Sequence, residues 1–344
     1  MNFKGRTDST LILHCHIPKT AGTTVSAGLR NSFDIFHFHH FHPDPFYILN
    51  CEVLEELLEI DPNLRSISSH HLRSFPLSVG SRPTFLMTFL RRPEDVFISQ
   101  LKHLQSQFAS FPDQVRCQWP KDTPHLPLRE LVRRYLDMSA AASQDFCSQT
   151  RFFCNPNAGA AVGLSDGHGY GLDNYEMTHQ ILTGFHFVGI VEEMKRSLEV
   201  LTDQLLQWGT KVYFKLGIKL NTGGSGAKPA WLTPEDEVGR RVLAASRNDR
   251  RLHEHFRQKL LQDHCELRKR KWLGFKPAAA DAKDAFAEGW RDGTRSLANS
   301  AQLYWSSRVD HTEQSVTPPL CSDLLELRAA RAVVARWQVA ELIH

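Results

Sequence analysis

Residues 11–33 constrain the fold of this chain more than any other segment. The run Leu-Ile-Leu at 11–13 begins a short apolar stretch, which is typical of a buried parallel strand. Pro18 ends that pattern, and a turn of small and hydroxyl-bearing residues follows. From Val25 the apolar positions recur at helical spacing. The segment therefore predicts a strand, a tight loop and a helix, which is the opening unit of an α/β fold.

The loop between this strand and helix is a candidate anion site. Such a loop aims successive backbone N–H groups and a helix N-terminus at one point, and Lys19 adds a positive charge. The residues that complete the loop are Thr20, Ala21, Gly22, Thr23 and Thr24. The P-loop of kinases and ATPases places Lys after its second Gly, whereas here Lys19 precedes Gly22. The expected ligand is a phosphate or a sulfate group.

The string at 16–24, HIPKTAGTT, resembles the 5′-phosphosulfate loop of sulfotransferases that use PAPS, 3′-phosphoadenosine 5′-phosphosulfate. It is most similar to the carbohydrate branch, which includes the heparan sulfate 2-O- and 6-O-sulfotransferases and soluble bacterial relatives. The resemblance implies a three-layer, P-loop-like α/β fold with a central parallel sheet. It also implies sulfuryl transfer from PAPS to a hydroxyl, leaving 3′,5′-ADP, with residues 19–24 at the phosphosulfate and no metal.

A second motif lies in residues 84–104, which predict another buried strand and a helix opened by a proline at its favoured first position. It resembles the family's 3′-phosphate motif, L-R-[DN]-P-x-x-R-x-x-S, and this likeness implies that Arg91 and Ser99 bind the 3′-phosphate of PAPS. Two positions depart from the motif. Arg92 replaces an acidic residue, and Val96 replaces a common Arg, so Arg92 is the candidate to compensate for the lost cation.

A sugar hydroxyl is a poor nucleophile, and a neutral imidazole can take its proton during transfer. In the family a strand ends in a pattern like I-[ST]-G-H, and its His is the catalytic base. Residues 67–70 (Ile-Ser-Ser-His) match with Ser in place of Gly, which implies that His70 is the base. His71, one residue further, is the alternative.

A histidine-rich segment at 34–42 is expected to be a strand and its following loop. Imidazoles two residues apart lie on one strand face and could share a metal ion. The histidines concerned are His37, His39, His40 and His42. No acidic or Cys residue with matching spacing lies nearby, so strand-edge histidines are the preferred interpretation and no metal is expected.

Later segments add candidates for nucleotide and acceptor binding. In the family a loop at the place of the glycine-rich 221–229 closes over the nucleotide, which implies a phosphate contact for Lys228; a simple linker is the alternative. Arg151 follows a family-like Q-T-R string and either binds acceptor anions or forms a structural ion pair. The loops at 108–127 and 155–174 are the expected acceptor walls.

The resemblance covers about residues 11–261, and the character of the sequence changes after 275. Residues 1–275 are therefore interpreted as a sulfotransferase domain and residues 276–344 as a C-terminal helical extension. Thr233 and Pro234 predict the start of a capped helix near the end of the domain. The extension is expected to pack on the domain, with homo-oligomerisation or partner binding as the alternative.

Composition excludes several classes. With 344 residues, 41% hydrophobic and 23% charged, the chain is globular in character, and a net charge of +3 is too mild to indicate nucleic-acid binding. The seven cysteines lack CxxC spacing and predict neither a disulfide framework nor a zinc site. No apolar leader and no 18-residue apolar run is present, so the expectation is a cytoplasmic enzyme without a membrane span.

Two rival functions differ in what they require of the sequence. A P-loop-type nucleotide or sugar kinase needs Mg²⁺ and an acidic ligand after a strand, where this chain has Arg91 and Arg92. A non-catalytic nucleotide-binding protein needs only the anion loops, and the match around His70 is imperfect. The acceptor of a sulfotransferase is not readable, because a glycan, a small alcohol or a natural-product hydroxyl would leave the same motifs.

Overall fold

A computed structural model describes residues 10–40, 49, 51–72, 78–108, 121–140, 148–153, 174–214 and 229–273. Its strands are β1 (Leu11–Cys15), β2 (His37–His40), β3 (Ser66–Ser69), β4 (Ser78–Val79), β5 (Arg82–Leu90) and β6 (Phe187–Ile190). Its α-helices are α1 (Gly22–Phe33), α2 (Cys51–Ile60), α3 (Pro93–Gln107), α5 (Leu128–Ala140), α6 (Ser148–Phe153), α8 (Asn174–Thr183), α9 (Met194–Gln207), α10 (Glu237–Ala245) and α11 (Arg247–Trp272). The predicted C-terminal extension lies outside the described residues.

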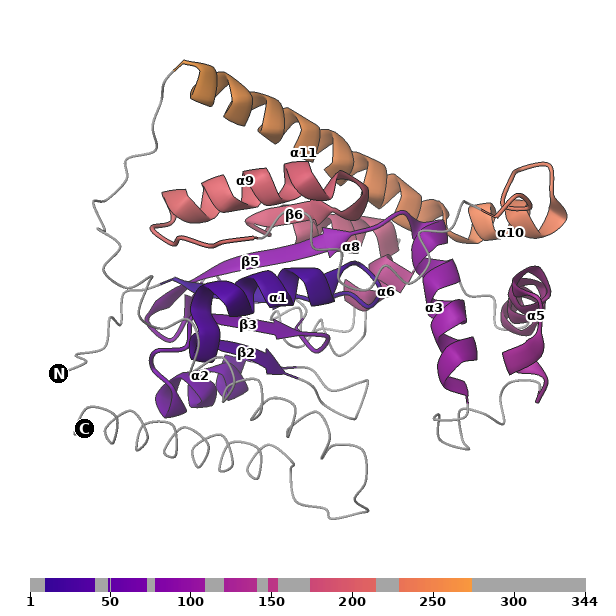
Figure 1. The fold of residues 1–344 in the computed structure, drawn as a ribbon, viewed down its shortest axis with the longest axis horizontal. Helices are drawn as coiled ribbons and strands as arrows, with labels where there is room; N and C mark the ends of the chain where they lie inside the picture. The colour runs from indigo at the N-terminus through magenta and orange to yellow at the C-terminus, as the bar shows by residue number, and fades with distance from the viewer. Residues whose placement is uncertain are drawn as a thin grey trace, which may run out of the picture.

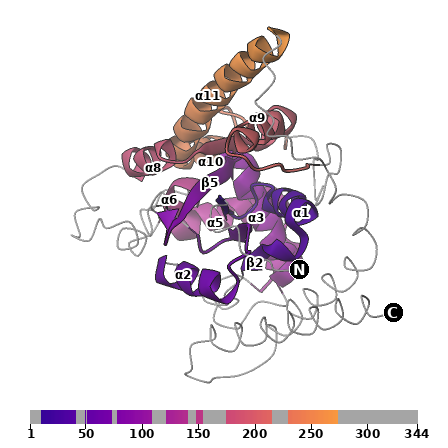
Figure 2. The ribbon, with the colours of Figure 1, turned by 90° about the vertical axis from the view of Figure 1, so that its left-hand side faces the viewer.

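The centre of the fold is a sheet in which five strands run parallel in the order β2-β3-β1-β5-β6 (Figure 1). The short β4 pairs antiparallel with the beginning of β5. All five residues of β1 are buried, because the strand is central and covered on both faces. Figure 2 shows α1 on one side of the sheet, with α6 and α8 on the other. The predicted α/β class with a central parallel sheet is confirmed.

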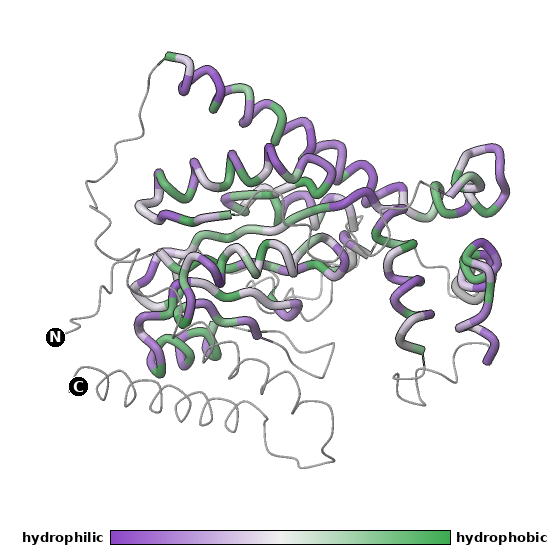
Figure 3. The backbone as a smooth tube through the Cα atoms, viewed as in Figure 1, coloured by the Kyte–Doolittle hydropathy of each residue, from purple (hydrophilic) through white to green (hydrophobic). Residues whose placement is uncertain are grey.

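Apolar side chains from the sheet and from α1, α2, α9 and α11 form one continuous core. Helix α11 contributes Leu252, Phe256 and Leu260 to it, at the spacing of four residues that places side chains on one helix face. The rest of its surface is hydrophilic along most of its length (Figure 3). No helix among the described residues is long and apolar enough to cross a membrane.

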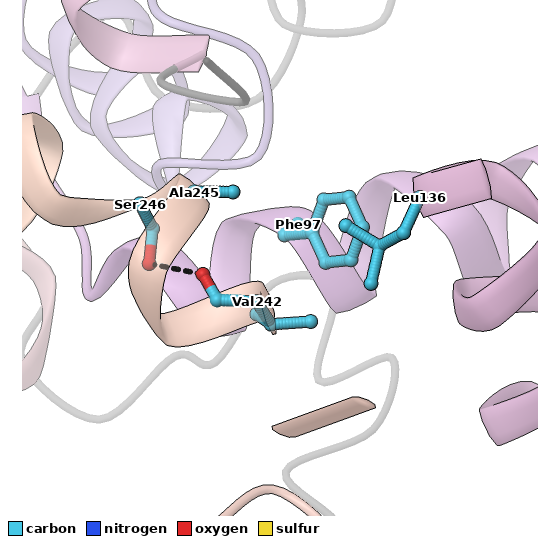
Figure 4. Close-up of a pocket in the computed structure, with 5 residues that line it drawn as sticks. All are labelled: Phe97, Leu136, Val242, Ala245 and Ser246. Carbon is cyan, nitrogen blue, oxygen red and sulfur yellow. Dashed lines mark hydrogen bonds between the residues drawn. The ribbon is translucent and has the colours of Figure 1, made fainter. Parts of the chain in front are cut away.

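A second apolar cluster joins α3, α5 and α10 beside the sheet. A crevice between these helices has no room for a water molecule, so it belongs to the packing of the cluster and offers no ligand site. The residues that line it are Phe97, Leu136, Val242, Ala245 and Ser246 (Figure 4).

The helix predicted to start at Thr233 and Pro234 instead begins at Glu237. Asp236 is its N-cap, and the Asp236 carboxylate accepts hydrogen bonds from the backbone N–H groups of Val238 and Gly239 at 2.9 and 3.1 Å. An Asp in this position satisfies helix donors that would otherwise have no partner. The N-cap therefore lies three residues after the predicted Thr233.

Candidate functional site

The carboxyl ends of β1 and β5 form the point at which the chain connections diverge. From β1 the chain proceeds through α1 to β2 at one edge of the sheet, whereas from β5 it proceeds to β6 on the other side. In open α/β sheets, ligands bind outside the strand ends at such a point. The anion loop follows β1, Arg91 follows β5, and His70 follows the neighbouring β3. The fold therefore brings together candidates from three separate segments.

The anion loop, residues 16–21, adopts a conformation that L-residues rarely take. Lys19 and Ala21 have φ values of 66° and 63°, in the left-handed region, which costs about 1–2 kcal/mol for each non-glycine residue. The Thr20 hydroxyl donates to the Ile17 carbonyl at 2.9 Å, and the side chain is only 1% exposed. The buried Thr20 side chain therefore stabilises the conformation of the loop by a hydrogen bond to its backbone.

Gly22 begins α1 directly behind this loop. A Cβ atom placed on Gly22 would lie 1.7 Å from the imidazole of His16, so no other residue fits without movement of that ring. Backbone N–H groups of Thr24 and Val25 donate to the Ala21 carbonyl and close the first turn. The glycine thus allows the helix N-terminus and the buried His16 ring to approach each other closely.

Lys19 and Arg91 are two cations held side by side. The Arg91 guanidinium donates from Nη1 to the Lys19 carbonyl at 3.2 Å. Burial, and then the charge of Arg91, lower the pKa of Lys19. No carboxylate of the described residues forms an ion pair with either side chain. Two adjacent cations without a counter-charge are electrostatically unfavourable, and a bound anion would relieve their repulsion.

Arg92 was the candidate to compensate for a missing cation, and the structure gives it another environment. Its side chain is 53% exposed and forms ion pairs with Asp95 and Glu192 at 3.3 and 3.6 Å. The backbone N–H of Arg92 also donates to Glu192 at 2.9 Å. Of the two neighbouring arginines, only Arg91 is directed at the anion loop.

Helix α3 begins at Pro93, two residues after Arg91. The predicted Ser99 is half-buried on this helix, and His103 lies four residues later, on the same face. Burial, and then the charge of Lys19, lower the pKa of His103. His103 was not among the residues predicted from the sequence, although its spacing of four from Ser99 was a usable signal. Lys228 lies outside the described residues, as does the side chain of Arg151.

His70, the predicted base, is anchored through one of its ring nitrogens. Its Nδ1 lies 2.6 Å from the carbonyl oxygen of His16. A carbonyl can only accept a hydrogen bond, so Nδ1 carries a proton, and in the neutral form of the ring Nε2 is the nitrogen that can accept one. The ring of His16 stacks on that of His70, with centroids 4.0 Å apart, and holds its orientation.

His71, the alternative base, is directed into the protein interior. The residue is only 3% exposed, and its ring meets the His40 ring edge-on at 5.6 Å. Its backbone N–H donates to the Ser69 hydroxyl, and its carbonyl accepts from the N–H of Leu49. These positions favour His70 over His71 as the group that can meet a substrate.

Each histidine of β1 and β2 has a ring nitrogen hydrogen-bonded to a serine hydroxyl. His37 and His39 share the Ser26 hydroxyl at 3.0 and 3.2 Å. His14 and His40 pair with serines of β3, Ser68 and Ser69. Burial is the main cause that lowers the pKa of His14 to about 3 and that of His39 to about 4, so both are neutral at pH 7. Within the described ranges, no three His, Cys, Asp or Glu side chains are placed to hold a metal ion.

When the sequence is compared with known proteins, no family model matches it, and neither does any curated protein.

Proposed function

We propose that this chain is a PAPS-dependent O-sulfotransferase that moves the sulfuryl group of PAPS to a hydroxyl, with carbohydrates as the first acceptor class to test. The observation that carries the proposal is the meeting of three groups at the ends of β1, β3 and β5. Lys19 and Arg91 supply positive charge that no carboxylate of the described residues pairs, and His70 supplies an imidazole anchored through Nδ1. The motif resemblance of residues 16–24 selects sulfuryl transfer among the reactions of bound anions.

The anion loop accounts for donor binding and for charge stabilisation. Its backbone N–H groups and Lys19 hold the 5′-phosphosulfate, and Thr23 and Thr24 in the first turn of α1 complete the cradle. Arg91 and Ser99 hold the 3′-phosphate, which separates PAPS from ATP. As the bond from sulfur to the bridging oxygen breaks, Lys19 and the helix N-terminus stabilise the negative charge that develops there.

His70 accounts for activation of the acceptor. The acceptor oxygen forms a bond to sulfur while its proton passes to Nε2 of His70, whose other nitrogen is anchored on the His16 carbonyl. The bond between sulfur and the bridging oxygen breaks, and its electron pair leaves with 3′,5′-ADP. The products are a sulfate ester, 3′,5′-ADP and a protonated imidazole, so atoms and charge balance.

Calorimetric titration with 3′,5′-ADP, and separately with ADP plus Mg²⁺, tests the proposal. We expect binding of 3′,5′-ADP in the micromolar range without metal, and at least tenfold weaker binding of ADP, because a charge-assisted contact contributes about 1.5–3 kcal/mol. A preference for ADP with Mg²⁺ would overturn the proposal in favour of a kinase. Tight PAPS binding without turnover on any hydroxyl acceptor would instead indicate a non-catalytic binding protein.

A further inference from the structure

The backbone of Arg91 is clamped by one side chain from a distant segment. The Gln149 amide accepts the Arg91 N–H at Oε1, at 2.9 Å, and donates from Nε2 to the Arg91 carbonyl at 2.8 Å. Both ends of the amide thus bond the same residue, across a sequence separation of 58. Arg91 lies just beyond the last residue of β5, where strand pairing ends, so these two bonds orient it in place of a strand partner.

Gln149 is itself held by a buried carboxylate. Asp249, in the first turn of α11, accepts hydrogen bonds from the N–H of Gln149 at 3.0 Å and from the N–H and hydroxyl of Thr150 at 2.7 and 2.8 Å. Asp249 is 1% exposed, and burial raises its pKa to about 6 in spite of these donors. Burial of a carboxylate is costly, and the three bonds to the start of α6 offset part of that cost.

These contacts continue to the anion loop through the side chain of Arg91. We propose that Gln149 and Asp249 are positioning residues, which hold Arg91 so that its guanidinium bridges to the Lys19 carbonyl and faces the bound anion. The series runs from α11 through α6 and the end of β5 to the loop after β1, by the bonds from Asp249 to Gln149, from Gln149 to Arg91 and from Arg91 to Lys19. This role rests on the proposed function, because it assumes that the anion is the 3′-phosphate.

A double-mutant cycle on the full chain tests the series. The wild type, Gln149→Met, Arg91→Ala and the double variant are titrated with 3′,5′-ADP. We expect Gln149→Met to weaken binding about five- to twentyfold, as for loss of one or two hydrogen bonds. If Gln149 acts through Arg91, the double variant binds within about twofold of Arg91→Ala alone. Independent, multiplying losses would overturn the positioning role.

Gln105→Met is the matched control. The Gln105 side chain donates from Nε2 to the carbonyls of Thr123 and Leu126 at 3.2 and 2.8 Å, so this variant also loses two bonds from an amide side chain to the backbone. We expect it to lower the midpoint of thermal unfolding and to leave 3′,5′-ADP affinity unchanged. If Gln149→Met behaves in the same way, with lower stability and wild-type affinity, Gln149 is merely structural.

A second readout needs no nucleotide and separates the two proposals. NMR titration of the Lys19 side chain measures its pKa, which the charge of Arg91 helps to lower. The positioning role predicts a higher Lys19 pKa in Gln149→Met and in Arg91→Ala, with no change in Gln105→Met. An unchanged pKa in Gln149→Met overturns it. Failure of the wild type to bind 3′,5′-ADP, with the pKa pattern as expected, overturns only the assignment of the anion.

Should Gln149→Met fail to fold, Asp249→Asn tests the same series from its other end. The NH2 group of Asn cannot accept a hydrogen bond, so at least one of the three bonds from Gln149 and Thr150 is lost. Asp236→Asn is its control, since Asp236 accepts two backbone N–H groups at the start of α10. We expect weaker 3′,5′-ADP binding and a higher Lys19 pKa only for Asp249→Asn. Equal behaviour of the two variants would exclude a role in positioning Arg91.

Discussion

The candidate site at the strand ends of the sheet has two halves, one positively charged and one neutral. In the cationic half, between β1 and β5, Lys19 and Arg91 lie together without a carboxylate of the described residues to neutralise them. In the imidazole half, on β1, β3 and β2, burial keeps His14 and His39 uncharged and serine hydroxyls satisfy their rings. The side chains of the first half are charged and have no carboxylate partner among the described residues, whereas His14 and His39 in the second half are neutral.

The arginines of α5 show how the same chain treats cations elsewhere. Arg133 and Arg134 both bond Glu130, and these hydrogen bonds lower the pKa of that carboxyl to about 2. These two arginines of α5 are therefore paired with a carboxylate. Under the proposed function, the unpaired charge of Lys19 and Arg91 binds the anionic donor, and His70 beside it accepts the acceptor proton.

The largest expected effect comes from His70→Ala, which removes the proton acceptor from the imidazole half. Turnover of PAPS should fall about 10²- to 10⁴-fold, the usual contribution of general-base catalysis, with 3′,5′-ADP binding nearly unchanged. His71→Ala is the control, and it should lower thermal stability while active protein retains turnover, because His71 is buried. Turnover of His70→Ala within fivefold of the wild type would place the base elsewhere.

Arg91→Ala removes charge from the cationic half. Affinity for 3′,5′-ADP should fall about 10- to 100-fold, because a charge-assisted contact contributes about 1.5–3 kcal/mol, and affinity for ADP should change little. Arg92→Ala is the matched control, and calorimetry should show less than about a twofold change, since exposed ion pairs such as that with Asp95 contribute little. Equal losses from both variants would refute the 3′-phosphate assignment.

Gly22→Ala tests whether the two halves are joined through His16. The added Cβ would clash with the His16 ring. We therefore expect the affinity for 3′,5′-ADP to fall about tenfold and the free energy of unfolding to fall by about 1–3 kcal/mol. Removing the ring in Gly22→Ala with His16→Ala should restore part of the lost stability. Gly184→Ala is the control, because a Cβ on Gly184 would lie 3.3 Å from its nearest neighbour, the Ile181 carbonyl oxygen. Chemical denaturation should show a smaller loss of unfolding free energy for this variant. Similar losses for both glycines would argue against the steric explanation.

The imidazole half should make stability depend on pH. His14 and His39 have folded pKa values of about 3 and 4, below the usual 6.5, so the unfolded chain binds more protons. Stability is thus full above pH 6.5 and falls as the pH drops toward 4, by up to about 1.4 kcal/mol for each unit of pKa difference. Asp249 has a raised pKa of about 6, so the folded chain binds its proton first, and this group increases stability as the pH falls from 6 to 3.8. The urea concentration at the midpoint of unfolding should therefore be lower at pH 5 than at pH 7. His39→Gln should reduce this difference. Equal midpoints of the wild type at the two pH values would contradict the neutral state of His14 and His39.

The local elements of the site were readable because each is encoded in contiguous residues. The strand, loop and helix at 11–33 appear as β1, the anion loop and α1, and Pro93 begins α3 as predicted. Arg91 was placed at a strand end by the apolar run before it. In each case, side-chain period and backbone restriction act within a few residues, so sequence spacing carries the information.

Other features depend on which distant segments meet. Sequence spacing gave no sign that Glu192 would pair with Arg92, or that Gln149 and Asp249 would hold Arg91 across separations of 58 to 100 residues. Such contacts arise only after the strands have taken their order in the sheet.

The sequence by itself determined the strands, the anion loop and the residue types available for chemistry, because short-range periodicity and turn chemistry act along the chain. The tertiary structure alone decided which of them face one another. Strand order places Arg91 against Lys19 and His70 against His16, burial keeps His14 neutral, and no carboxylate of the described residues pairs with the two cations. Charge balance depends on distance and solvent exposure, and neither is written in residue order.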